Sequence, residues 1–317
     1  MLILQSNYSP PAILFSKHLE TIYPALFRKV DGVRYTRERI DTPDEDFLDL
    51  DWSCIGSKEL VIISHGLEGN ASKPYMRGMT SAINTRLKKD VLAWNYRGCS
   101  GEMNRANRFY HSGATDDLDL VVSYASAKGY ASIQLVGFSL GGNLTLKYLG
   151  ESDRPQIESA VVFSVPLDLE ASSFEMMKWF NYMYSQRFLI TLKKKVKEKM
   201  PPLPHAIDKK GIDKLKHVFH FDEVITAPLH GFDDARHYYR ECSSLFFLSG
   251  IKTPTLIINA QNDPFLSATC FPFEDLKDHP FVYFEAPERG GHVGFADFKN
   301  SIYWSEKRAT EFLGKTP

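Results

Sequence analysis

The pattern Gly-x-Ser-x-Gly at residues 137–141 constrains the fold of this chain more than any other stretch. It follows a short apolar run at residues 132–136 and opens a stretch of helical length. At a sharp turn of this kind the serine takes strained backbone angles, and small residues on either side let the strand and the helix pack closely. Composition alone would produce such a pattern in roughly one chain in ten of this length, so the interpretation depends on the flanking strand and helix. We predict that Ser139 presents a nucleophilic hydroxyl at this turn, supported by Gly137 and Gly141; the alternative is an ordinary glycine-rich turn.

Further apolar runs predict the sheet that surrounds this turn. They are short, rich in β-forming residues and apolar almost throughout, as strands buried on both faces of a parallel sheet are. Stretches of helical length separate them, and such alternation predicts right-handed crossovers and a doubly wound sheet. Residues 33–53 read instead as two antiparallel strands around a turn at Thr42-Pro43-Asp44. We expect a mostly parallel eight-stranded sheet with helices on both faces. The parallel runs lie at residues 60–63, 91–94, 133–136, 160–163 and 254–258.

One long segment interrupts this alternation and sets the domain organisation. Residues 167–250 contain no convincing strand and many aromatic and methionine side chains, which predicts a helical cap inserted between two core strands. A chain of 317 residues can still form one α/β unit. We therefore expect a single domain with its core at about 30–166 and 251–317, and an amino-terminal extension, residues 1–30, packed on that core.

A serine hydroxyl needs a neighbouring base to become a good nucleophile. At a turn of this type the chain order is serine, then acid, then histidine. Asp263 follows the predicted strand 255–259, at the edge where α/β sites form, and His292 lies in a glycine-rich loop near the end of the chain. The alternatives are a turn-forming aspartate before a proline and an ordinary loop histidine. Asp168, just after the preceding core strand, is a rival acid, although a hinge or loop role suits it as well.

The negative charge that develops on the substrate during acyl transfer needs two backbone N–H donors. We expect one from Leu140, directly after the serine, and one from Leu67, in the loop of residues 64–69 after an early strand. His65 and Gly66 lie in the same loop. We interpret both as residues that shape the turn, and His65 as a structural residue rather than a second base.

Charge and cysteine content exclude several classes of function. The chain has 38 basic and 39 acidic residues, a net charge of -1, so it has no global field that would attract nucleic acid. It has no uncharged apolar run of about 18 residues and no secretory start, so we expect no integral membrane segment. Four scattered cysteines favour a reducing cytoplasm over a disulfide framework. We find no phosphate-loop or HExxH pattern, and we expect no cofactor and no metal.

Several other features leave two interpretations open. The aromatic and methionine-rich stretch at residues 174–184 can line an acyl pocket or form the packed underside of a cap helix. The lysine run at residues 193–197 is more typical of a solvated helix face, with peripheral contact to anionic lipid as the alternative. Arg97 and His111 either support the site or stabilise loops.

The serine turn and several segments spread along nearly the whole chain together resemble the YheT-like branch of the α/β-hydrolases. His18–Pro24 resembles the HLQT motif of that family, although Glu20 stands where glutamine is usual. The other matching segments are residues 46–52, 95–101, 110–113, 263–265 and 291–295. The resemblance implies a hydrolase of carboxylic esters that uses Ser139, Asp263 and His292.

The function that we predict is hydrolysis of short- to medium-chain acyl esters through an acyl-enzyme on Ser139. An acyltransferase with the same three residues and a lipase or phospholipase-like activity are alternatives, and a non-catalytic binding module is a third. The expected partner is a small-molecule ester, and the sequence leaves the oligomeric state open.

Overall fold

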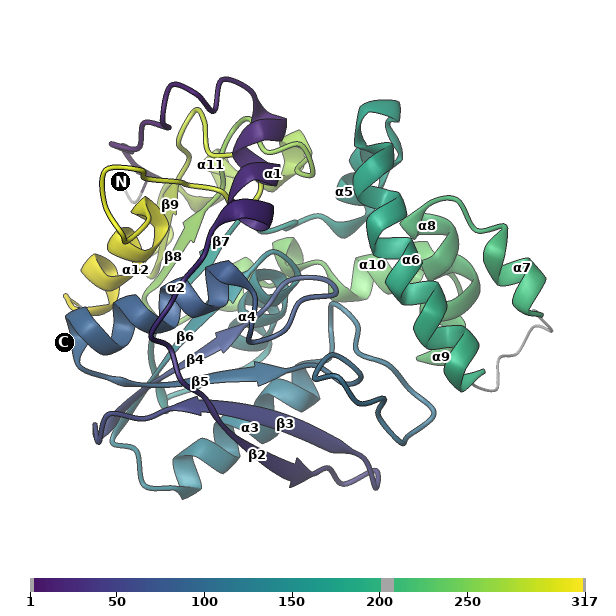
Figure 1. Ribbon diagram of the computed structural model, residues 1–317, viewed down its shortest axis with the longest axis horizontal. Coiled ribbons are helices and arrows are strands. Elements are labelled where there is room, and N and C mark those ends of the chain that lie inside the picture. The colour runs from purple at the N-terminus through teal and green to yellow at the C-terminus, as the bar shows by residue number, and fades with distance from the viewer. Residues whose placement is uncertain (1–2, 201–207, 316–317) are drawn as a thin grey trace.

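A nine-stranded sheet forms the centre of the computed structural model, which describes residues 3–200 and 208–315 (Figure 1). The strand order is β1-β9-β8-β7-β6-β4-β5-β3-β2. Strand β3 runs antiparallel to both of its neighbours, and the other pairs are parallel. The strands are β1 (Ile3–Leu4), β2 (Thr36–Asp41), β3 (Phe47–Ser53), β4 (Glu59–Ser64), β5 (Asp90–Asn95), β6 (Ser132–Phe138), β7 (Ile157–Phe163), β8 (Thr255–Ile258) and β9 (Val282–Glu285).

Eight of these strands, β2 to β9, form the sheet expected from the apolar runs, including the antiparallel pair at residues 36–53. The ninth is the two-residue strand β1, which pairs in parallel with β9. It lies in the amino-terminal extension, where two residues are too few to give a periodic signal. Its pairing covers the backbone groups that would otherwise form an open edge of β9.

Helices cover both faces of the sheet, as the alternation of strands and helices predicts. One apolar core joins α3 and α4 to one face, through side chains such as Leu118 and Leu144. The other core joins α2 and α12 to the opposite face, through Met79 and Leu313 among others. The helices outside the long insertion are α1 (Lys17–Phe27), α2 (Pro74–Ala82), η1 (Ile83–Leu87), α3 (Thr115–Ala127), α4 (Leu140–Glu151), η5 (Ala268–Cys270), α11 (Phe273–Leu276) and α12 (Trp304–Leu313).

Between β7 and β8 the described residues form helices and no strand, and these helices gather beside one end of the sheet (Figure 1). Most of them share apolar clusters of their own, around Phe221 and around Tyr239, whereas residues 244–250 pack on the main core through side chains such as Leu248. This is the helical cap insertion. Its elements are α5 (Leu169–Met177), η2 (Trp179–Asn181), α6 (Tyr182–Lys199), α7 (Lys209–Asp213), α8 (Val218–Phe221), η3 (Asp222–Thr226), α9 (Ala227–Leu229), α10 (Ala235–Cys242) and η4 (Ser244–Gly250).

The strand order decides which loops meet. Strands β6, β7, β8 and β9 are neighbours and all run in parallel, so the loops that follow them lie along one edge of the sheet. These loops contain Ser139, Ser164, Asp263 and His292, in the order of the strands. Residues up to 153 positions apart in sequence are thereby brought to one place.

Candidate active site

Ser139 stands alone between the last residue of β6 and the first residue of α4. Its backbone angles, φ 53° and ψ −118°, are strained for a residue with a side chain. The flanking glycines make this turn possible. A Cβ at Gly137 would lie 2.5 Å from the carbonyl oxygen of Gly141, and one at Gly141 would lie 2.4 Å from that of Ser64. The sharp strand-to-helix turn expected from the sequence is therefore present, with the serine at its apex.

His292 lies between Ser139 and Asp263. Its Nε2 is 2.9 Å from the Ser139 hydroxyl, and its Nδ1 is 2.8 Å from Oδ2 of Asp263. The Asp263 side chain is fully buried, and that of His292 is 10% exposed. The other carboxylate oxygen of Asp263 accepts a hydrogen bond from the backbone N–H of Phe265. In the neutral histidine, Nδ1–H donates to the carboxylate, which leaves Nε2 to accept the serine proton.

The rival acid, Asp168, does not contact His292. It is the N-cap residue of helix α5, and its Oδ1 accepts a hydrogen bond from the backbone N–H of Ala171. Its second oxygen accepts a hydrogen bond from the Thr269 hydroxyl at 2.7 Å. Asp168 is thus a helix cap that also ties the insertion to the core.

The loop that carries His292 is held by residues whose role the sequence did not reveal. The hydroxyl of Thr21, on α1, accepts a hydrogen bond from the backbone N–H of His292 at 2.9 Å. Ser164, after β7, does the same for the N–H of Val293 at 2.9 Å. Thr21 belongs to the HLQT-like segment, so the resemblance marked the position without giving its function.

Glu20 completes this support from the neighbouring position on α1. Its carboxylate is 1% exposed and accepts hydrogen bonds from the backbone N–H of Gly290 and from the Asn262 amide. It also pairs with Arg289. Asn262 in turn accepts a hydrogen bond from the N–H of Gly291, whose φ of 59° suits a glycine. Glu20 therefore links the histidine loop to the loop that carries the acid.

Leu140 and Leu67, the expected backbone donors, both lie beside Ser139. Both line the same cavity as the serine and His292. Leu140 is the first residue of α4, and the first N–H groups of a helix have no acceptor within the helix. Gly66 packs against the serine, because a Cβ at Gly66 would lie 3.2 Å from the Cβ of Ser139.

His65 is a buried structural residue. Its Nδ1 is 2.8 Å from the carbonyl oxygen of Gly66, and its Nε2 accepts a hydrogen bond from the backbone N–H of Tyr96. Burial lowers the pKa of His65 to about 3. The ring is therefore neutral at physiological pH, and both nitrogens are occupied in shaping the loop that carries Leu67.

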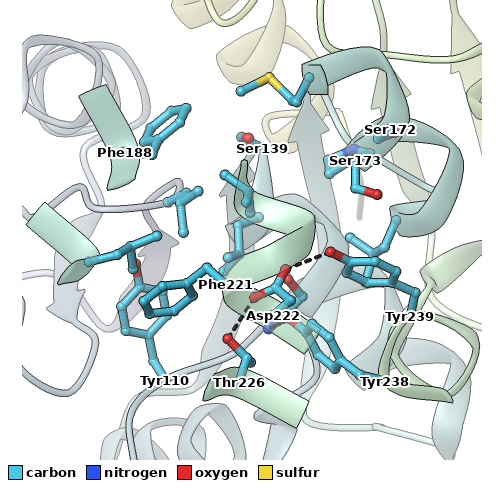
Figure 2. Close-up of a pocket in the computed structure, with 18 of the residues that line it drawn as sticks. Tyr110, Ser139, Ser172, Ser173, Phe188, Phe221, Asp222, Thr226, Tyr238 and Tyr239 are labelled. Atoms are coloured by element: carbon cyan, nitrogen blue, oxygen red, sulfur yellow. Dashed lines mark hydrogen bonds between the residues drawn. The ribbon is translucent and has the colours of Figure 1, made fainter. Parts of the chain in front are cut away.

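Two cavities open from Ser139. The first, here called the inner chamber, lies between the core and the insertion and has a volume of about 150 Å³ (Figure 2). Its walls are mainly apolar and include Met176, Phe188 and Phe221. The second, here called the α1 chamber, has a volume of about 300 Å³ and lies between α1, α2 and α6. Ser139 and His292 line both chambers, so a bound molecule can extend from the serine in two directions.

The aromatic and methionine-rich stretch at residues 174–184, Arg97 and His111 each had two possible roles. Met176 lines the inner chamber, whereas Trp179 and Met183 are 86% and 82% exposed, so the aromatic stretch supplies the chamber only in part. Arg97 is buried and forms ion pairs away from Ser139, which gives it a structural role. His111 is half-buried, and desolvation lowers its pKa well below the usual value.

The lysine run is largely engaged with other parts of the protein. Lys195 forms an ion pair with Glu68, and Lys197 pairs with Asp213. Lys193 donates to the carbonyl oxygen of Asp213.

Among the helices of residues 3–200 and 208–315, none combines the length and the apolar character that a membrane span needs.

Comparison with known proteins agrees with this fold. The model of the α/β hydrolase fold family matches residues 59–298. The chain therefore belongs to the α/β-hydrolase fold family.

Within that family the chain is YheT-like. It is 37% identical to "Putative esterase YheT" of Escherichia coli (strain K12), over 93% of this chain and 89% of that protein. It is 30% identical to the monoacylglycerol lipase of Saccharomyces cerevisiae, over 86% of this chain and 62% of that lipase. Among solved structures, the Pyrococcus furiosus esterase Pf2001 has the same fold, with a TM-score of 0.61 at 21% identity over 91% of this chain and 97% of that one.

Proposed function

We propose that this protein is a serine hydrolase that cleaves carboxylic esters through an acyl-enzyme on Ser139. The observation that supports this most directly is the chain of hydrogen bonds from Asp263 through His292 to Ser139, at 2.8 and 2.9 Å. The esterase and lipase named among its relatives agree with ester chemistry.

In the proposed cycle, His292 takes the proton of the Ser139 hydroxyl as the oxygen attacks the ester carbonyl. Asp263 fixes the imidazole tautomer and stabilises the imidazolium that forms. The backbone N–H groups of Leu67 and Leu140 stabilise the oxyanion. His292 then gives the proton to the leaving alcohol, and a water molecule activated by the same histidine releases the acid.

The positions of the two chambers predict where the alcohol and the acyl group of the ester bind. The leaving oxygen must face His292 to receive its proton, and the histidine loop, with Val293 and Gly294, lines the α1 chamber. The alcohol therefore leaves through the α1 chamber, and the acyl group occupies the inner chamber. A dry cavity of about 150 Å³ holds a molecule roughly the size of benzene. The inner chamber has a comparable volume, which supports short- to medium-chain acyl groups.

A fluorophosphonate probe tests the nucleophile directly. We expect it to add its mass to the peptide that contains Ser139, and we expect Ser139→Ala to lose hydrolysis of short p-nitrophenyl esters. Ser126→Ala is the serine control, because Ser126 lies on α3 and its hydroxyl donates to the carbonyl oxygen of Val122 rather than to the histidine loop. The probe should still label that variant. Labelling at another serine, or wild-type rates from Ser139→Ala, would contradict the proposal.

An acyltransferase would use the same acyl-enzyme, with an alcohol in the α1 chamber taking the place of water. The volume of that chamber, about 300 Å³, leaves room for such an acceptor. The ratio of the two products, free acid and new ester, distinguishes the two activities. A hydrolase gives mainly free acid when alcohols are added at millimolar concentration, whereas an acyltransferase gives mainly new ester.

A further inference from the structure

The inner chamber contains one acidic side chain that the proposed cycle does not use. Asp222 is the first residue of η3, in the insertion, and it lines the chamber together with Ser139. Figure 2 shows its carboxyl group within the chamber, apart from the serine. Because the serine belongs to the core and Asp222 to the insertion, the chamber extends from the reacting atoms to this carboxyl group.

The carboxyl group of Asp222 has few partners. Its Oδ1 accepts a hydrogen bond from the Thr226 hydroxyl at 2.6 Å, and its Oδ2 accepts one from the Tyr239 hydroxyl at 2.7 Å (Figure 2). No cationic side chain in the described ranges forms an ion pair with it. A carboxylate has about four acceptor positions, so two remain for a donor that enters the chamber.

A hydrogen-bond donor in the chamber would stabilise the carboxylate of Asp222, because its surroundings are apolar. The chamber walls are mainly apolar, and burial raises the pKa of Asp222 to about 6. A carboxyl group in apolar surroundings is costly unless hydrogen bonds satisfy it. A leucine would fill the same place without this penalty, so apolar packing alone does not explain an acid at this position.

We propose that Asp222 is a specificity subsite for an acyl group that carries a hydroxyl at its far end, an inference that rests on the proposed ester hydrolysis. The hydroxyl donates a hydrogen bond to Asp222, and the methylene groups between the hydroxyl and the ester pack on the apolar walls. A hydroxyl suits this position better than an ammonium group, because it enters an apolar chamber without the desolvation cost of a full charge. The preferred substrates are therefore ω-hydroxyacyl esters of medium length.

The experiment compares p-nitrophenyl esters of ω-hydroxy acids with the matching alkanoates, at four, six and eight carbons. We expect kcat/KM of the wild type to favour the hydroxy ester on the order of tenfold at one of these lengths, because a hydrogen bond to a charged group is stronger than one between neutral groups. The Asp222→Leu variant should reverse this preference, by losing rate on the hydroxy ester and gaining rate on the alkanoate. Asp222→Asn, of the same shape, should lower the preference without removing it.

Asp213→Asn is the matched control, since Asp213 lies on α7 in the same insertion and does not line the inner chamber. It should keep the wild-type preference. An equal rate on both ester types, unchanged in the two Asp222 variants, would overturn the subsite and leave ester hydrolysis intact. A higher rate on ω-amino esters would overturn the choice of a hydroxyl. If the wild type hydrolyses none of the esters and no probe labels Ser139, the proposed function itself fails.

Discussion

Glu20 on the first helix accepts a hydrogen bond from the backbone N–H of Gly290 at 2.9 Å, across 270 residues of sequence. Gly290 stands two residues before His292, and the carboxylate of Glu20 also holds Asn262, next to Asp263. One buried side chain thus fixes two loops relative to each other. The spacing of the base and the acid in the proposed cycle depends on it.

Replacing Glu20 should therefore affect catalysis more than binding. We expect Glu20→Ala to lower kcat by about 10- to 100-fold with a smaller change in KM, because a small displacement of a reacting group costs on the order of 100-fold. Glu20→Gln keeps a carbonyl oxygen for both donors and should retain most of the rate. Ester hydrolysis kinetics check both variants, with a melting curve for each. Equal losses in the two variants would mean that the charge, rather than the hydrogen bonds, holds the loops.

Asp263→Asn tests the orientation of the histidine. An amide at this position can donate its N–H₂ to Nδ1 and stabilise the wrong tautomer of His292, whose Nδ1 is 2.8 Å from the carboxylate. In a serine protease, this exchange lowers kcat about 10⁴-fold, and we expect a loss of similar order here. Asp168→Asn is the control, since Asp168 caps α5 and does not contact His292. A comparable loss of kcat in the control would indicate that Asp168, rather than Asp263, is the acid that orients His292.

Gly141→Ala should damage both stability and rate. The new Cβ would lie 2.4 Å from the carbonyl oxygen of Ser64 and 2.5 Å from that of His65, so it pushes on the loop that carries Leu67. Overpacking of this kind costs about 1–3 kcal/mol of unfolding free energy. Chemical denaturation and kcat measure the two effects. Gly129→Ala is the control for a loss of stability away from the site, because Gly129 has a φ of 86° and no neighbouring atom within 4 Å; it should lose stability through backbone strain and keep its kcat.

Arg97 should prove essential for stability and not for chemistry. Its guanidinium contacts Asp117 and Asp46, both of them buried. Removing one partner of a buried ion pair costs about 3–5 kcal/mol, because the other charge is left uncompensated. We expect Arg97→Leu to lower the melting temperature strongly, with kcat unchanged while the protein is folded. Arg236→Leu, which removes an exposed pair with Glu170, should change the unfolding free energy by less than about 1 kcal/mol. Similar effects in the two variants would contradict this interpretation.

The pH dependence of stability tests the state of Asp222. Burial raises its pKa from the ordinary 3.8 to about 6, and its contacts, Thr226 and Tyr239, are neutral. The folded protein then holds this proton more tightly than the unfolded chain does, so unfolding releases it between about pH 4 and pH 6. The contribution of Asp222 to the unfolding free energy therefore falls by about 3 kcal/mol as pH rises through this window.

Asp222→Asn does not titrate, so the stability of this variant relative to the wild type should increase by that amount from pH 4 to pH 7. Urea denaturation of both proteins at a series of pH values measures the difference, and all other groups cancel. A constant difference over the series would show that the carboxyl group titrates at an ordinary pKa.

The parts of the fold that could be predicted are those with local signals. Strand β4 is apolar at residues 60–63, because these residues are buried on both faces of the sheet, and that property is visible in a short window. The turn at Ser139 was recognisable because glycines must stand where strand and helix nearly touch. Chain order then identified Asp263 and His292, and in the structure His292 lies within hydrogen-bond distance of both Asp263 and the serine.

What could not be predicted depends on contacts between distant segments. Thr21 and Ser164 are ordinary polar residues in sequence, and their support of the histidine loop exists only once α1 and β7 are in place. The same holds for Asp222, which is one acid among many until the insertion folds over the core. The catalytic roles, the cap boundaries and the cytoplasmic location stay predictions.

The support that α1 gives to the histidine loop also has a consequence during synthesis of the protein. Ser139 is translated 153 residues before His292, and the histidine loop takes shape only when the first helix meets a segment that lies 270 residues further along the chain. Contacts between such distant residues form slowly, because a long loop must close first. On the ribosome, Ser139 therefore emerges without a positioned base. A chain that has not yet been extended past His292 holds no competent site, and activity begins only after the histidine loop has met the first helix.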